Sequence, residues 1–322
     1  MSLHQDVKKS QRAAFAVGTR NNLKTQWKSF LLFTTFFNLV ALPATLQTIC
    51  LYAQFLSRSF KSVASIRNYL NGVKLLHFFL GFECVSFKSL SLSLLLKGVS
   101  RINPHVPRRV LPITPAILLQ FHSSLQLCFP FDATIWCAFL LSFFLMARKS
   151  NMVPKSIFSF DSHKHLTRGK IFSSSKGLIV LLTWSKTIQT GGRVLKIPLM
   201  AIPNHPLCPV AAFRNMVSLV PASSSSPAFV VPTKFGLRSL TFNSYVSALR
   251  KLLSQAGFEP SLYSGHSFRR GGASWAFHSG VPGELIQLHG DWQSDAYLLY
   301  LSHSLQSKCS VSCAMAQAFP HL

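Results

Sequence analysis

Acidic residues are scarce in this chain of 322 residues. Eight Asp and Glu stand against 33 Lys and Arg, and no carboxylate occurs between Asp6 and Glu83. The other six acids are scattered singly along the chain. A nuclease or transposase that holds two metal ions needs several carboxylates close together. The composition therefore argues against two-metal chemistry, and we expect no metal site.

Paired cysteine motifs are missing as well. The seven cysteines form no Cys-x-x-Cys pair and no Cys/His spacing typical of a zinc site. Cys309 and Cys313 are spaced to share a helix face, but nothing near them completes a ligand set. We therefore expect plain thiols in a reducing compartment. The first residues, "MSLHQDVKKS", lack the apolar core of a signal peptide, so secretion is not expected.

Positive charge is what the chain has in excess. The formal net charge is +25. A folded chain with this balance needs a polyanionic partner, and the two classes that fit are nucleic acid and an anionic membrane surface.

One stretch bears on the membrane alternative. Residues 29–57 carry no charge and are numerous enough to span a bilayer. However, Asn38, Pro43, Gln47 and Gln54 recur within this stretch, and its apolar residues form two helix-length groups on either side of Pro43. Two amphipathic helices broken at "LPAT" fit this pattern better than one span. The run 135–147 is too short to span and predicts a buried helix.

The chain divides by composition into a helical first part and a mixed second part. Residues 1–24 are polar and basic and are expected to be flexible. Four helical patterns follow within 25–102. Residues 103–115, "NPHVPRRVLPITP", have the prolines and arginines of a stiff basic linker. Residues 116–322 make a larger domain.

The larger domain is predicted to be mostly helical with one small sheet. Residues 116–147 have a helical pattern, as do 208–220 and the stretch up to Gly257. Between them, "KIFSSSKGLIVLLTW" and "RVLKIPLM" are β-rich runs joined by "SKTIQTGG". This pattern predicts a β-hairpin or small antiparallel sheet.

Two basic residues of the larger domain stand out by position. Arg148 follows thirteen apolar or small residues, so its guanidinium would be placed in advance to fork onto a phosphate, although a solvated helix-end arginine is the simpler reading. Lys186 lies at the predicted hairpin turn, where an ordinary turn lysine is also common.

Two further features lie near the end of the chain. In "GHSFRRGGASWAF", His266 and Arg269 are three residues apart and would share one helix face. The stretch "HGDWQSDAYLLYLSH" contains Tyr297 and Tyr300. Taken alone, the first would be a basic helix start and the second a pair of core aromatics.

In this order and register, the features resemble the catalytic set of the tyrosine recombinases, the phage-integrase and Cre-like class of site-specific DNA recombinases. That family has an arginine at a helix end, a lysine on a β-hairpin, a His-x-x-Arg box, a His or Trp, and a tyrosine nine residues later. "GHSFRRGGAS" closely matches the box, and Tyr300 follows it by about thirty residues. The sequences "GHSFRRGGASWA" and "GDWQSDAYLLYL" are similar to the corresponding stretches of recombinases from DIRS-like retrotransposons and Cryptons.

The resemblance implies a fold for the whole chain. Residues 25–102 would be an all-α, SAM-like four-helix core-binding domain that closes a clamp around DNA. Residues 116–322 would be an α+β catalytic domain with a small antiparallel sheet.

The resemblance also implies a metal-independent and cofactor-independent reaction that cleaves and rejoins DNA through a 3′-phosphotyrosyl link. Arg148 and Arg269 would bind the scissile phosphate, since fixed cations stabilise the extra charge of the transition state. Tyr300 would attack phosphorus, and His266 would assist its deprotonation. Lys186 would protonate the departing 5′ oxygen.

Two positions depart from the family pattern. Asp291 stands nine residues before Tyr300, where the family has His or Trp, with Trp292 beside it and His289 two residues earlier. We expect Trp292 to fill this role through a shift of one residue. Asn151 replaces the glutamate that usually braces the first arginine.

Several expectations concern partners. Arg108, Arg109 and Arg270 are expected to contact double-stranded DNA, and Gly271 and Gly272 to let the backbone approach it. The resemblance implies a homo-tetramer on two synapsed duplexes. The segment after Tyr300 would dock on a neighbouring copy or form a disordered tail. We expect no membrane association and a place in the nucleus, or otherwise the cytoplasm. The alternatives are an inactive DNA-binding descendant, a membrane-associated basic protein and a type IB topoisomerase.

Overall fold

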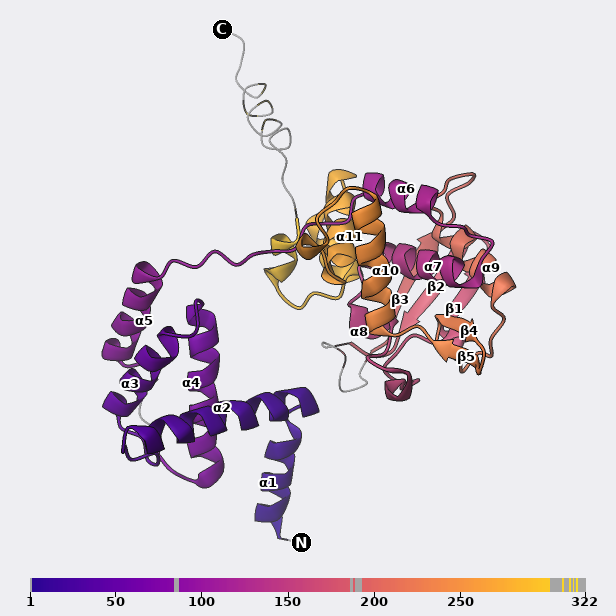
Figure 1. Ribbon diagram of the computed structural model, residues 1–322. Helices are drawn as coiled ribbons and strands as arrows, with labels where there is room; N and C mark the ends of the chain where they lie inside the picture. The colour runs from indigo at the N-terminus through magenta and orange to yellow at the C-terminus, as the bar shows by residue number, and fades with distance from the viewer. Residues whose placement is uncertain are drawn as a thin grey trace. The chain divides into compact units, whose positions relative to one another are not determined.

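The computed structural model divides the chain into two compact units, 1–108 and 109–322 (Figure 1). It describes residues 2–83, 87–185, 188, 193–301, 309, 313, 315 and 317. Each unit has its own hydrophobic core, and each is described by itself.

The first unit is entirely helical over its described residues. Its helices are α1 (Leu3–Ala13), α2 (Val17–Phe36), α3 (Leu46–Ser57), α4 (Val63–Leu80) and α5 (Leu90–Ile102). Helices α3 and α5 are capped at their N-terminal ends by Thr45 and Ser89, whose hydroxyls accept a hydrogen bond from the backbone N–H three residues on. The apolar faces of α2–α5 form one core, in which Phe30, Tyr52 and Ile66 are fully buried. The four helical patterns of 25–102 are therefore present.

The charge-free stretch 29–57 is shared between two helices. Helix α2 ends at Phe36 and α3 begins at Leu46, with Pro43 in the irregular segment between them. Within the described part of the chain, no helix is both long and apolar enough to cross a membrane.

The N-terminal residues, which the sequence predicts to be flexible, include a helix. Residues 3–13 form α1, and none of the helix's residues is buried. Asp6 in its first turn and Arg12 in its last turn both favour the helix dipole. The chain then turns directly into α2, which begins at Val17, so that the first core helix starts eight residues before the predicted boundary at 25.

The second unit surrounds a largely apolar helix, α7. Its helices are α6 (Pro115–Ser124), α7 (Pro130–Phe144), α8 (Lys149–Met152), α9 (Pro209–Leu219), α10 (Phe242–Gln255), α11 (His266–His278) and α12 (Gly283–His289), with short 3-10 helices η1 (Ile157–Ser159), η2 (Arg168–Lys170), η3 (Pro260–Leu262) and η4 (Asp295–Leu299). Every residue of α7 from Ala133 to Phe143 is buried. Helices α9 and α11 and strand β4 (Val230–Thr233) all contact α7. Residues 135–144 of the predicted buried helix therefore lie in α7, whereas 145–147 form the buried turn that follows it.

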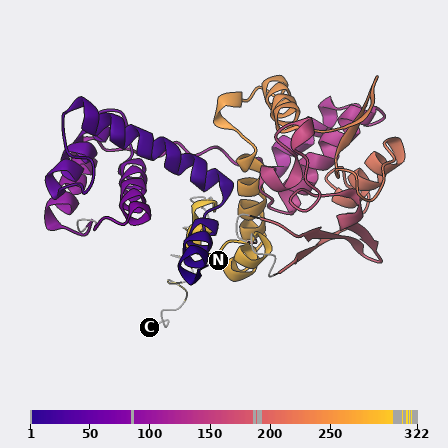
Figure 2. The same ribbon diagram turned by 90° about the horizontal axis from the view of Figure 1, so that it is seen from below.

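A three-stranded antiparallel sheet has the order β1 (Ile171–Ser174), β2 (Gly177–Leu182), β3 (Leu195–Met200), seen among the labelled strands of Figure 1 and from below in Figure 2. Leu178 pairs with Leu199 and Val180 with Ile197, and all four side chains face the core. The predicted small antiparallel sheet is confirmed. A second hairpin, β4 with β5 (Gly236–Ser239), was not predicted, because its strands are short and its second strand is largely exposed.

The segment expected to be a linker is partly built into the second unit. The backbone N–H of Leu111 donates to the carbonyl of Leu262, and that of Ile113 donates to the carbonyl of Ser267. Ile113 is fully buried. Apolar residues between the prolines of 103–115 therefore pack against the start of α11.

The glycine step after Arg269 packs α11 into the core, which corrects the expectation that it lets the backbone approach DNA. A Cβ on Gly271 would collide with the carbonyl oxygen of Ile113, and one on Gly272 with that of Phe143. Both glycines are buried. They therefore serve the close approach of α11 to α7 and to the chain before α6.

We expect Gly272→Ala to lower the stability of the second unit by about 1–3 kcal/mol, the usual cost of overpacking a core. The added methyl meets backbone rather than a movable side chain. Thermal unfolding would measure the effect. Gly98→Ala is the matched control, because Gly98 is helical and has open space where the methyl would go. A Gly272→Ala midpoint equal to that of the wild type would contradict this packing.

Candidate active site

Arg148 is placed by the way α7 ends. The helix stops at Phe144, and Met146 adopts a left-handed backbone conformation with φ of 46°. Arg148 then stands extended as the N-cap of α8, with its side chain only 20% exposed. Its Nη1 lies 3.8 Å from Oδ2 of Asp291. The sharp turn after α7 sets the position of this arginine, which stands four residues beyond the end of α7 rather than on the helix itself.

Arg269 is the most enclosed cation of the group. It lies on the buried face of α11 and is 2% exposed. Its Nη1 donates to the carbonyl of Met146, so the left-handed turn before Arg148 is joined directly to α11. Its Nη2 has no hydrogen-bond partner among the described residues. A buried guanidinium N–H without a protein acceptor is available to an incoming anion.

The surroundings of Arg269 lower the pKa of its guanidinium. Burial is the main cause and the nearby charge of Arg148 adds to it, while Tyr300 and Asp291 oppose the shift. Two arginines held this close repel each other, and an anion between them would relieve that repulsion.

His266 stands at the first position of α11, where it is exposed to solvent. Partial desolvation lowers its pKa, and the charges of Lys149, Arg269 and Arg148 lower it further. The lowered pKa favours the neutral imidazole, the form that can accept a proton.

We expect a titration of the His266 imidazole, followed by NMR, to give a pKa below its ordinary value of about 6.5. Lys149→Gln should raise this pKa, because it removes the largest of the repelling charges. His266→Gln assigns the resonance. A value at or above about 6.5 in the wild-type protein would contradict the cationic surroundings described for this residue.

Tyr297 and Tyr300, the two tyrosines in and just after η4, have different surroundings. Tyr300, at the C-terminal end of η4, is half-buried, and its ring lies 5.9 Å from the guanidinium carbon of Arg269. The hydroxyl of Ser274 on α11 donates to its backbone carbonyl at 2.7 Å. Tyr297 is buried among apolar residues of α11 and α12, and its hydroxyl lies against Gly283. Tyr300 is therefore the tyrosine that adjoins the arginine.

His289, Asp291 and Trp292 are the candidates for the family's His or Trp position. Of these three, Trp292 contacts Arg269. The guanidinium carbon of Arg269 lies 3.7 Å from the centre of the indole, a cation–π contact, and the Trp292 and Tyr300 rings are 5.6 Å apart. His289 instead bonds through Nε2 to the carbonyl of Phe144. Asp291 is buried and pairs with Arg148 and Arg193.

Lys186 lies outside the described residues. The residue before it, Ser185, is buried, and its hydroxyl donates to Oδ2 of Asp291 at 2.6 Å. Arg193, on the other side of the same connection, pairs with Oδ1 of Asp291. Sequence reasoning missed Ser185 and Arg193, since neither belongs to a motif and only their contacts with Asp291 distinguish them.

The three arginines expected on DNA have different roles in the fold. Arg108 and Arg109 are exposed. Nη1 of Arg109 donates to the carbonyl of Leu299 at 3.4 Å, next to Tyr300. Arg270 is half-buried and donates to the carbonyl of Val110 at 2.8 Å. Arg270 therefore also fixes the chain before α6 against α11.

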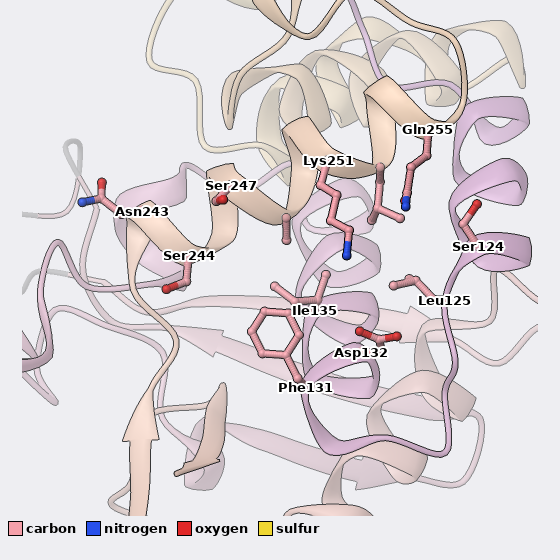
Figure 3. Close-up of a pocket in the computed structure, with 12 residues that line it drawn as sticks. Ser124, Leu125, Phe131, Asp132, Ile135, Asn243, Ser244, Ser247, Lys251 and Gln255 are labelled. Carbon is pink, nitrogen blue, oxygen red and sulfur yellow. The ribbon is translucent and has the colours of Figure 1, made fainter. Parts of the chain in front are cut away.

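A metal ion would need a cluster of ligating side chains in the described part of the chain, and a small molecule a surface hollow. Within the described ranges, no three His, Cys, Asp or Glu side chains gather as a metal site. A surface hollow between α10 and the N-terminal end of α7 is lined by Lys251 and Asp132 (Figure 3), and it includes none of the predicted site residues.

Comparisons with known proteins bear on the fold. No protein-family model matches the chain, and no curated protein matches it in sequence. Among solved structures, the XerH site-specific recombinase bound to a palindromic difH substrate is 15% identical with a TM-score of 0.64, covering 97% of this chain and 83% of that one. The Tn1549 transposon integrase in complex with circular intermediate DNA is 16% identical with a TM-score of 0.53, covering 84% and 86%.

A lambda integrase dimer bound to a core site is 12% identical with a TM-score of 0.56, covering 94% of this chain and 96% of that one. At such low identity the likeness concerns the fold, and it extends over most of each chain. The protein therefore shares its fold, mostly helical with a small antiparallel sheet, with these recombinase and integrase structures.

Proposed function

We propose that the protein is a site-specific DNA recombinase or integrase that cleaves and rejoins DNA through a 3′-phosphotyrosyl intermediate, in the integration of a mobile element related to DIRS-like retrotransposons or Cryptons. The observation that carries the proposal is the surroundings of Arg269. This buried guanidinium has an N–H without a protein partner, and it lies beside Arg148, Trp292 and Tyr300.

The proposed reaction is a transesterification. Arg148 and Arg269 hold the non-bridging oxygens of the scissile phosphate, and the Tyr300 oxygen attacks phosphorus. The Tyr300 O–P bond forms as the bond to the 5′ oxygen breaks. The tyrosine gives up its proton with the help of neutral His266, and Lys186 protonates the departing 5′ oxygen. Rejoining is the reverse, in which the 5′ hydroxyl attacks the phosphotyrosine. The covalent link conserves the bond energy, so no nucleotide cofactor takes part.

Double-stranded DNA is the proposed partner. The net charge of +25 supplies phosphate contacts throughout the chain, and the exposed Arg108 and Arg109 lie just before the second unit's core. XerH, the Tn1549 integrase and lambda integrase were each solved on DNA. We propose the nucleus as the place in the cell where the protein meets this DNA.

We also propose a homo-tetramer on two synapsed duplexes. An apolar hollow between β3, α11 and α12 is lined by Trp275, Leu285 and Leu288, all of them well exposed. A neighbouring copy would cover it with its segment after Tyr300, much of which lies outside the described residues. Light scattering on the protein–DNA complex should give four chains per two duplexes, and Leu288→Lys should reduce this number.

A trapping experiment tests the proposed chemistry. The substrate is a library of nicked duplexes with a randomised core, in which cleavage releases a short strand that diffuses away and leaves the enzyme bound. We expect adducts that resist SDS and form in EDTA, and sequencing the trapped DNA would identify the target. An inactive DNA-binding descendant, the alternative motivated by Asp291 and Asn151, would shift the duplexes in a gel without forming adducts. Relaxation of supercoiled DNA without strand exchange would instead favour a type IB topoisomerase.

A further inference from the structure

The two positions that depart from the family pattern make contacts with the same segment of the fold. Asp291 stands where a His or Trp was expected, and Asn151 where a glutamate was expected. Both side chains belong to buried residues, at 5% and 2% exposure. Both contact the connection between β2 and β3, which the sequence predicts to carry Lys186.

Asp291 joins the two ends of that connection. Its Oδ2 accepts the Ser185 hydroxyl hydrogen bond at 2.6 Å, and its Oδ1 pairs with Arg193. Ser185 and Arg193 flank residues 186–192 in the sequence. The same carboxylate lies 3.8 Å from Nη1 of Arg148. One carboxylate therefore ties both ends of the connection to the first arginine of the site.

Asn151 fixes the same end of β2 from the other side. Its amide nitrogen donates to the carbonyl of Trp184, the residue before Ser185. Asn151 lies on α8, the short helix whose N-cap is Arg148. The end of β2 is thus held by the element that starts at Arg148 and by the carboxylate that contacts Arg148.

The backbone around Asp291 is shaped for this contact. Asp291 is left-handed, with φ of 56°, which costs energy in a residue other than glycine. A Cβ on Gly290 would collide with the indole of Trp292. The turn therefore needs glycine at position 290 and holds Asp291 in a strained backbone conformation. In this conformation the Asp291 carboxylate lies near Arg148 and the Trp292 ring lies against Arg269.

We propose that Asn151 and Asp291 are positioning residues that anchor Trp184, Ser185 and Arg193, the base of the β2–β3 connection, beside Arg148. A buried carboxylate is costly unless charged and hydrogen-bonding partners surround it, and here Arg193, Arg148 and Ser185 do so. Because Lys186 follows Ser185 directly in the sequence, fixing Ser185 limits where the Lys186 ammonium reaches. The inference rests on the proposed function for what that ammonium does.

A substrate with a better leaving group separates this role from phosphate binding. In a duplex whose 5′ bridging oxygen is replaced by sulfur, the P–S bond breaks and a thiolate departs. A thiol has a pKa of about 8.5, so the thiolate leaves without being protonated. A defect that acts through the general acid disappears on this substrate, whereas a defect in phosphate binding remains.

We expect Asp291→Asn to slow adduct formation on the ordinary duplex by about 100-fold, the cost of moving a reacting group by about 1 Å. On the sulfur-containing duplex the variant should recover most of the wild-type rate. Asn151→Leu should behave in the same way. The matched control is Asp132→Asn, which removes an acid of the same unit whose carboxylate accepts from the backbone N–H of Gln126, and which should react like wild type on both substrates.

Two outcomes would overturn the proposal: no loss in Asp291→Asn on the ordinary duplex, or an equal loss on both duplexes. If the wild-type protein forms no adduct with either duplex, the proposed function fails. The anchoring role of Asp291 is then tested separately, by the rate of limited proteolysis with trypsin. Cleavage after Lys186 and Arg193 in the native protein should be faster in Asp291→Asn than in wild type or Asp132→Asn. Equal rates in the three proteins would contradict the anchor.

Discussion

Tyr300→Phe is expected to abolish the covalent protein–DNA adduct and to leave DNA binding unchanged. The substitution removes only the hydroxyl that would attack phosphorus, and no other group of the site replaces a lost nucleophile. The ring keeps its contacts with Trp292 and Arg269, which are 5.6 Å and 5.9 Å away. Denaturing gels of the trapping reaction measure the adduct, and gel shifts measure binding.

Tyr297→Phe is the matched control for this result. Tyr297 is buried in the cluster with Ala273, Ile286 and Trp292, and its hydroxyl lies against Gly283. The variant should keep the adduct. If Tyr297→Phe loses the adduct while Tyr300→Phe retains it, the nucleophile has been assigned to the wrong tyrosine.

Arg269→Lys is expected to reduce the rate of adduct formation by about 10²–10³-fold, the usual effect of losing a donor that stabilises the transition state. Lysine keeps the charge, but it lacks the planar fork that binds two oxygens at once. It also lacks the face that packs on Trp292 at 3.7 Å. Single-turnover rates on the trapping substrate measure the loss, and thermal unfolding shows whether the variant still folds.

Arg270→Lys separates this effect from general loss of charge. Arg270 is half-buried and donates to the carbonyl of Val110. We expect a small loss of DNA affinity with a normal rate once DNA is saturating. If the two lysine variants lose the same single-turnover rate, then Arg269 has no special place in the chemistry.

The helices, the sheet and the candidate site residues could be named from the sequence because their signals are local. Helix α7 was evident from a run of apolar residues that ends before Arg148, and the sheet from β-rich runs on either side of Gly191 and Gly192. The order of Arg148, His266, Arg269 and Tyr300 indicated one site, and the fold places Arg269 beside Arg148 and Tyr300.

The remaining features depend on contacts between residues far apart in the sequence. Nothing in "GGRVL" indicates that Arg193 pairs with Asp291, 98 residues later. The partners of Gly271 and Gly272 are backbone carbonyls of other elements, which leave no trace in composition. The sequence identified Asp291 and Asn151 as departures from a pattern, and only their contacts suggest why these residue types stand there.

Mass spectrometry of the trapped adduct tests the central claim most directly. After nuclease and trypsin treatment, the nucleotide should be found on the peptide from Gly271 to Lys308, which contains both Tyr297 and Tyr300. Fragmentation of that peptide is predicted to place the nucleotide on Tyr300. A nucleotide on any other residue, or none on this peptide, would contradict the account.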